Sequence, residues 1–261
     1  MAAVMNSAPL VVALVDLVAV GIYLFLGWRF SQRSVTAVNK LPVLQFSLFW
    51  LGLALVTFIT GLESAVAAFT TPPLALVVTL FYIELLLLCA VLWGLVGYLV
   101  YLYAGRSFLA PLTTMYAVLY VLLVYFVTAS DPAAVTVAVG AVGLQYATPV
   151  GGPLLGLLVL VLIFPEFLAA IFYFTLVFRT RDRTARYRIA LVSWGLLAFF
   201  GLGFVGVDTR LGGGLAAVTL GSLLGLLPAL VILIAYYPPR LVRERLGVTG
   251  IDPVAGPLPP Q

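Results

Sequence analysis

The sequence contains no histidine, one cysteine (Cys89) and one lysine (Lys40) among its 261 residues. A single cysteine cannot form a disulfide within the chain. Zinc, copper and haem sites are built mainly from histidine and cysteine ligands, so these absences predict no metal site and no cofactor. The sequence also shows no nucleophile with a partner base, and we therefore expect that the protein is not an enzyme.

Charged residues are scarce as well, at 8% of the chain, whereas 64% of the residues are hydrophobic. A soluble domain of this composition would expose too little charge to water, which indicates an integral membrane protein. The alternating segments of roughly ten residues that are typical of a barrel do not occur, so we predict an all-α fold. The N-terminus lacks the basic residues of a signal peptide, so the first apolar stretch should remain as an anchor.

Apolar stretches long enough to cross a bilayer occur seven times. Each has roughly the 20 residues that a spanning helix needs, within the tolerance that tilting allows. We predict a seven-helix transmembrane domain over residues 1–238 and a short basic, proline-rich cytoplasmic tail over residues 239–261. The predicted spans are residues 9–28, 43–62, 74–104, 109–129, 153–178, 189–207 and 215–237.

The basic residues predict the orientation of these spans. Of the 13 basic residues, all but Arg210 fall on one side of the predicted bundle. Cytoplasmic loops carry an excess of lysine and arginine, so we expect the N-terminus outside and the C-terminus in the cytoplasm. The densest run lies between the fifth and sixth spans and contains Arg179, Arg181, Arg183, Arg186 and Arg188. Its default role is to set the topology, and contact with acidic lipid or an acidic partner protein is the alternative; nucleic acid is not expected.

The longest loop, residues 130–152, lies on the predicted outer side. Residues 134–139 and 144–148 flank a Gly-Ala-Val-Gly segment and would form a small β-hairpin, or else the loop is ordered but irregular.

An internal repeat is a further expectation. Residues 22–33 resemble residues 172–183, and similar aromatic–arginine ends occur at 101–106 and 235–240. This pattern predicts three spans repeated on either side of the fourth, or reflects only the common placement of aromatic and arginine residues at membrane interfaces.

Three acidic residues, Asp16, Glu84 and Glu166, lie within predicted spans, and no lysine or arginine lies within any of them. A charged carboxylate at the centre of a bilayer costs about 3 kcal/mol or more, so burial favours the neutral acid. One interpretation is a proton or cation relay or a ligand-binding site, to which Tyr82 and Tyr173, and also Tyr98, Tyr116 and Tyr120, would add hydroxyl groups. The other is a set of structural hydrogen bonds between helices.

Pro165 directly precedes Glu166 within the fifth span. Proline has no N–H group, so it leaves a carbonyl near position 161 without its usual helical donor. A free carbonyl beside an acid favours a polar binding site in mid-membrane, although proline also occurs in spanning helices for packing alone.

Seven helices with an outer N-terminus and a 3+1+3 arrangement resemble the broad architecture of opsins, receptors and small transporters. A retinal protein is excluded, because retinal binding requires a lysine in the last span and Lys40 lies in the first inner loop.

Three motifs carry a closer resemblance. An arginine-rich turn precedes a span that runs from Trp50 to an acid, Glu63. YAGR at residues 103–106 is followed by LAP at 109–111. An arginine-rich element that ends in Tyr-Arg, RTARYR at residues 183–188, precedes the sixth span. In these features the chain resembles the seven-helix N-terminal sensor module of bacterial and archaeal histidine kinases. The resemblance implies a module in a prokaryotic plasma membrane. Since no output domain follows Arg245, it would signal through a separate partner.

Three functions remain open from the sequence. The first is a receptor-like sensor that binds an unidentified apolar or weakly polar small molecule, or a membrane partner. The second is a proton- or cation-coupled carrier in which Glu84 and Glu166 titrate. The third is a structural subunit of a membrane complex.

Overall fold

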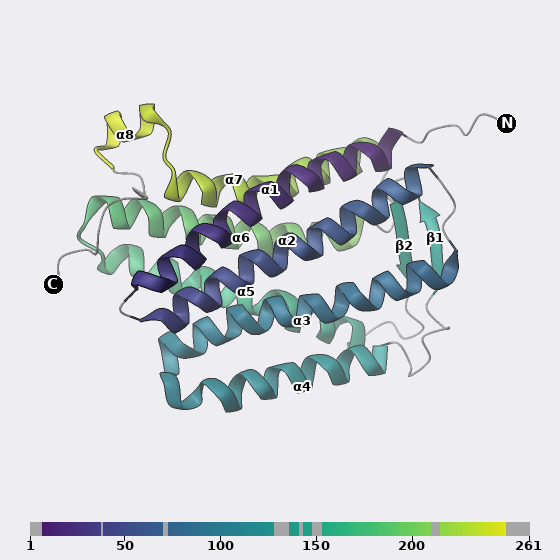
Figure 1. Ribbon diagram of the computed structural model, residues 1–261, viewed down its shortest axis with the longest axis horizontal. Coiled ribbons are helices and arrows are strands. Elements are labelled where there is room, and N and C mark those ends of the chain that lie inside the picture. The colour runs from purple at the N-terminus through teal and green to yellow at the C-terminus, as the bar shows by residue number, and fades with distance from the viewer. Residues whose placement is uncertain are drawn as a thin grey trace.

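The computed structural model describes residues 7–37, 39–69, 73–127, 136–140, 143–147, 153–209 and 215–248. In these residues long helices lie side by side and one short hairpin covers an end of the bundle (Figure 1). The elements are α1 (Ser7–Thr36), α2 (Lys40–Phe69), α3 (Leu74–Ala104), a 3₁₀ turn η1 (Arg106–Phe108), α4 (Leu109–Val127), β1 (Thr136–Gly140), β2 (Gly143–Ala147), α5 (Pro153–Arg179), α6 (Arg183–Thr209), α7 (Leu215–Tyr236) and α8 (Arg240–Leu246).

Five of the described helices, α1 to α5, are long and apolar enough to cross a membrane. A sixth candidate joins the described end of α7 to α8, which meet at a bend of 55°. The helix surfaces suit lipid, since large hydrophobic side chains such as Leu17 (58% exposed), Leu86 (63%) and Met115 (63%) point outward. The predicted helical membrane fold is therefore confirmed at this coarser level.

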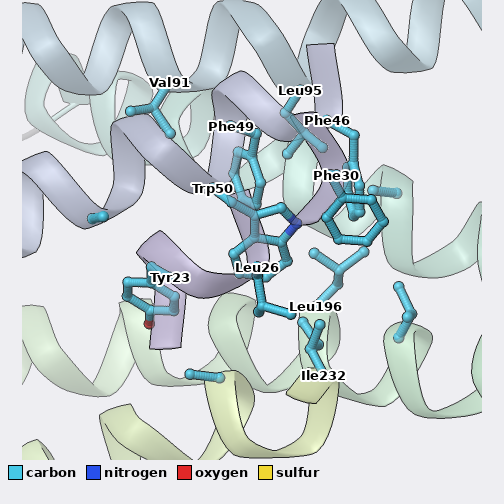
Figure 2. Packing of buried hydrophobic residues seen from close by; sticks show 14 of the residues in the cluster. Tyr23, Leu26, Phe30, Phe46, Phe49, Trp50, Val91, Leu95, Leu196 and Ile232 are labelled. Atoms are coloured by element: carbon cyan, nitrogen blue, oxygen red, sulfur yellow. The ribbon is translucent and has the colours of Figure 1, made fainter. Parts of the chain in front are cut away.

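The helices follow one another around the bundle. The most extensive contacts are those of α1 with α2, α2 with α3, α5 with α6 and α6 with α7. α7 also packs against α1. α4 lies beside α3 and α5. The interior between α1, α2 and α3 is aromatic: Trp50, which is fully buried, packs edge-on against Phe46 and Phe49 (Figure 2).

Three helices extend well beyond the predicted spans, and one of them is α6, which has 27 residues. α1 and α2 each contain 30 residues, because the polar residues that flank the apolar stretches continue the helix. Sequence analysis placed Glu63 at the outer end of the second span, but α2 continues to Phe69. Glu63 is therefore an internal residue of α2, and only 4% of it is exposed.

Strands β1 and β2 form an antiparallel hairpin in which Thr136 pairs with Ala147 and Gly140 with Gly143. The hairpin interpretation of the long loop is therefore right, and the irregular one is wrong for these residues. β2 packs on α2, and β1 touches α3.

The α1–α2, α3–α4 and α5–α6 connections and α8 all lie at the end of the bundle opposite the hairpin (Figure 1). We call this the basic end, because Arg33, Lys40, Arg106 and the basic runs of residues 179–188 and 240–245 lie there. Arg210, predicted for the other side, lies outside the described residues.

Candidate functional site

Glu84 on α3 is bonded to the neighbouring helix α2. The Thr60 hydroxyl lies 3.0 Å from Glu84 Oε1 and 3.1 Å from the carbonyl oxygen of Val56, one turn earlier in α2. The Thr60 hydroxyl is therefore the donor to Glu84, and it shares its single proton between the carboxyl oxygen and the Val56 carbonyl.

Two tyrosines one turn apart on α4 reach the helices on either side. The Tyr120 hydroxyl donates to the carbonyl of Leu85, the residue after Glu84, at 2.8 Å. The Tyr116 hydroxyl donates to the carbonyl of Val161 on α5 at 3.0 Å. Val161 is four residues before Pro165, so Tyr116 supplies the donor that proline removes, at the position predicted from the sequence.

Glu166 lies on the inward side of this arrangement. It is close enough to the hydroxyl groups of Tyr23 on α1 and Tyr116 on α4 to interact with both electrostatically. Glu84 interacts in the same way with Tyr120. We call Thr60, Glu84, Tyr116, Tyr120, Glu166 and Tyr23 the carboxyl cluster. Its members come from five helices and are related to the two acids by the Thr60 hydrogen bond and by electrostatic interactions.

Asp16 adjoins the cluster through Tyr23, with which it also interacts electrostatically. It packs against α2, where a Cβ atom added at Gly61 would lie 3.1 Å from the Cβ of Asp16. The glycine therefore makes the space that lets this acid lie between α1 and α2.

The other two candidate residues lie apart from Glu84. The Tyr82 hydroxyl is buried without a hydrogen-bond partner among the described residues, and its ring packs edge-on against Phe81. It is two positions from Glu84, a spacing that does not share a helix face. Tyr173 is hydrogen-bonded to Tyr98 on α3, nearer the basic end.

Tyr173 belongs to a row of rings that crosses the bundle, which we call the aromatic ladder. Its members are Tyr236 (α7), Phe30 (α1), Phe46 (α2), Tyr98 (α3) and Tyr173 (α5). Successive ring centroids are 4.9, 5.0, 5.2 and 6.4 Å apart. Contacts at these distances tie five helices together between the carboxyl cluster and the basic end.

Two cluster members, Thr60 and Tyr23, were not singled out from the sequence. Thr60 lies about as far from the end of α2 as Glu84 lies from the start of α3, which is a signal for antiparallel neighbours. Tyr23 gave no such signal, because its position depends on how α1 packs against a distant helix.

The basic run between α5 and α6 is a structured turn. Asp182 Oδ2 accepts a hydrogen bond from the backbone N–H of Ala185 at 2.6 Å and so caps α6. Arg186 Nε donates to the carbonyl of Thr180 at 3.1 Å. Of the five predicted contact residues, Arg179, Arg181, Arg183 and Arg186 are exposed, whereas Arg188 is half-buried.

Within the described part of the chain, no three acid, cysteine or histidine side chains lie together as a metal-ligand set. The chain matches no protein-family model, and no curated protein or solved structure shows significant similarity to it.

Proposed function

We propose that the protein is a receptor-like membrane sensor in which the carboxyl cluster responds to a small ligand and the basic end passes the change to a partner. The observation that carries the proposal is the separation of two layers, with polar groups in the half of the bundle nearer the hairpin and packed rings in the other half.

Helix geometry gives the spacing of these layers. At 1.5 Å per residue, Glu84 lies about 15 Å along α3 from its start, and Tyr98 lies about 21 Å further on. On α5, Tyr173 lies about 10 Å beyond Glu166 toward the basic end. A carrier needs access to its site from both sides in turn, and the ladder fills the interior on one side. A site that packed rings close off from the basic end suits a sensor better than a carrier.

The orientation and the number of spans belong to the same proposal. With the basic end in the cytoplasm, the positive-inside bias is satisfied and the N-terminus is outside. α6 and α7 would then complete seven spans, and the hairpin would lie on the outer surface above the carboxyl cluster.

The output surface is the basic end. Its α5–α6 turn is held by the Asp182 cap and by the bond from Arg186 to Thr180, so it presents its exposed arginines in a fixed arrangement. A partner with an acidic surface suits such a turn. A shift of α5 relative to α3 would reach the turn through Tyr98 and Tyr173, which join the two helices.

Ligand retention tests the proposal. The full chain is purified in a mild detergent, and the small molecules that it retains are extracted and identified by mass spectrometry. We expect one organic compound in near-equimolar amount, retained by the wild type and by the Asp182→Asn control and lost from Glu84→Ala and Glu166→Ala. Equal retention by all four proteins would contradict a ligand site at the carboxyl cluster.

A proton-coupled carrier is the second candidate, and a specific observation favours it: two tyrosines one turn apart on α4 each interact electrostatically with one of the two acids, Tyr116 with Glu166 and Tyr120 with Glu84. Vesicles that contain the protein and a pH-sensitive dye separate the two functions. After the external solution is acidified, a carrier would admit protons in a manner lost in Glu84→Gln. A sensor would leave the internal pH as it is in protein-free vesicles.

A further inference from the structure

The chain turns sharply at the end of α7 and forms one short further helix, α8. The two helices meet at a bend of 55° and are separated by Pro238 and Pro239, which lack backbone N–H groups. In Figure 1, α8 lies at the basic end and stands clear of the bundled helices. Its seven residues include Arg240, Arg243 and Arg245. Arginine is costly among acyl chains, so α8 is better placed at the membrane surface than inside the membrane.

α8 is held at both ends, but the described residues do not cover its apolar side chains. Pro238 before it is buried, and Val248, which follows the left-handed turn at Gly247 (φ 62°), is only 3% exposed. Between them, Leu241 is 69% exposed and Leu246 is 44% exposed. Because large apolar side chains are unfavourable in water, this exposure indicates an apolar surface outside the bundle that α8 contacts.

Helix geometry places the apolar and charged residues of α8 on different sides. At about 100° per residue, three apolar residues lie within an arc of about 140°: Leu241, Val242 and Leu246. The charged residues on the opposite side are Arg240, Arg243 and Glu244. Arg245 falls within the apolar arc, and its long side chain can extend outward from there. α8 is therefore amphipathic.

The charge of α8 suits an anionic surface. Glu244 is the only acid in the helix, and its Oε1 atom lies 2.6 Å from Arg240 Nε. The same helix offers no further acid to balance the positive charges of Arg243 and Arg245. Arginines beside anionic lipid are attracted to the headgroups, and amphipathic helices with basic residues lie in the plane of the membrane surface.

Aromatic contacts show that α8 begins at the level of the headgroups. On α1, the guanidinium carbon of Arg29 lies 5.1 Å from the centroid of the Trp28 ring and 5.4 Å from that of Phe25. The Phe25 ring contacts Tyr237, at 5.1 Å between centroids. Arginine among tryptophan and tyrosine is typical of the headgroup region. Tyr237 is three residues before Arg240, so α8 follows at the same level.

We propose that α8 docks on anionic lipid, with Leu241, Val242 and Leu246 inserted between the lipid molecules and Arg243 and Arg245 bound to the headgroups. This surface is separate from the carboxyl cluster. It depends neither on the proposed sensor function nor on which leaflet faces the cytoplasm.

Lipid quenching tests the orientation of α8. The full chain carries Cys89→Ala and one new cysteine, either Leu241→Cys on the apolar side or Glu244→Cys on the charged side, labelled with the same fluorophore. Both positions are exposed, so the label does not disturb the bundle. The proteins are placed in lipid discs of phosphatidylcholine and phosphatidylglycerol with brominated acyl chains.

We expect the Leu241→Cys probe to be quenched about threefold more strongly than the Glu244→Cys probe, because an interfacial helix inserts its apolar side about 5–10 Å. Equal quenching of the two probes would overturn the proposal. So would a Leu241→Cys probe that stays in water, which is the result that a docking face for a partner protein would give in discs without that partner.

A second comparison tests the lipid charge. In discs of phosphatidylcholine alone, quenching of the Leu241→Cys probe should fall about twofold, because the attraction of the arginines to anionic headgroups is lost. Arg243→Gln combined with Arg245→Gln should remove this dependence on phosphatidylglycerol. Arg106→Gln, which removes an exposed arginine at the same end, should preserve it. Quenching that is the same with and without phosphatidylglycerol would refute binding to anionic lipid.

Discussion

Single hydroxyl groups join α4 to its neighbours, and the bond from Tyr116 to the Val161 carbonyl is the one whose cause is clearest. Pro165 leaves that carbonyl without its helical donor. We expect Tyr116→Phe to lower the free energy of unfolding by about 1 kcal/mol, as hydrogen bonds between membrane helices do. Unfolding in mixed micelles of mild detergent and dodecyl sulfate measures the change.

A second substitution isolates the bond. In Pro165→Ala the backbone N–H at position 165 can donate to Val161, so the Tyr116 hydroxyl becomes redundant. The cost of Tyr116→Phe should therefore be smaller in the Pro165→Ala background than in the wild type. An equal cost in both backgrounds would show that the tyrosine stabilises the protein by packing alone.

Thr60 offers a similar comparison for Glu84. Thr60 and Thr79 each lie within bonding distance of the carbonyl four residues earlier, but Thr60 also reaches Glu84. We expect Thr60→Val to cost about 1 kcal/mol of unfolding free energy, because the Glu84 carboxyl loses its partner, and Thr79→Val to stay within about 0.5 kcal/mol of the wild type. Comparable losses in the two variants would argue against a structural bond at Glu84.

Among the elements, α1 and α2 make the most extensive contact, and a glycine allows their close approach. A Cβ added at Gly27 would lie 2.6 Å from Leu51 Cγ and 3.1 Å from its backbone nitrogen. The Ser47 hydroxyl donates to the Gly27 carbonyl at 2.7 Å, which holds the helices at this separation. Small residues allow such backbone approach in membranes.

This contact predicts opposite results for two glycines on α1. Gly27→Ala should destabilise the protein by about 1–3 kcal/mol, because the added methyl group overpacks the α1–α2 contact. Gly21→Ala should be neutral or slightly stabilising, because nothing lies within 4 Å of the added atom and alanine favours the helix. Thermal unfolding in one detergent compares the pair, and a Gly27→Ala protein as stable as Gly21→Ala would refute the tight contact.

The elements also show how far the sequence could predict this structure. α3 occupies the predicted residues 74–104, because apolar residues fill that stretch until Gly105, whose φ of 83° ends the helix. Glu63 was misplaced because an acidic residue was taken to mark the end of the span, whereas α2 continues to Phe69 and buries Glu63. The free carbonyl of Val161 could be predicted from the sequence, because Pro165 lacks the N–H group that would bond to it. The pairing of Glu84 with Thr60 instead depends on the register between two helices. Hydropathy alone does not set that register.

At the scale of the whole molecule, the number of spans decides where the two termini lie. Seven spans put them on opposite sides of the membrane, whereas six put them on the same side. The α1–α2, α3–α4 and α5–α6 connections all lie at the basic end (Figure 1). If α7 also crosses the membrane, the number of spans is therefore seven. In the proposed orientation, which follows the positive-inside bias, the C-terminus would be in the cytoplasm.

Labelling with a membrane-impermeant maleimide tests this topology in intact cells. In a Cys89→Ala background, we expect Gln145→Cys in β2 to be labelled from outside and Ser107→Cys in η1 to be labelled only after the cells are permeabilised. A fluorescent protein fused after residue 261 should fluoresce, because it would fold in the cytoplasm, and an N-terminal epitope tag should be detected on intact cells. Detection of both termini on one side would reduce the bundle to six spans. Labelling of Ser107→Cys alone in intact cells would reverse the orientation, and would move the carboxyl cluster to the cytoplasmic half of the membrane.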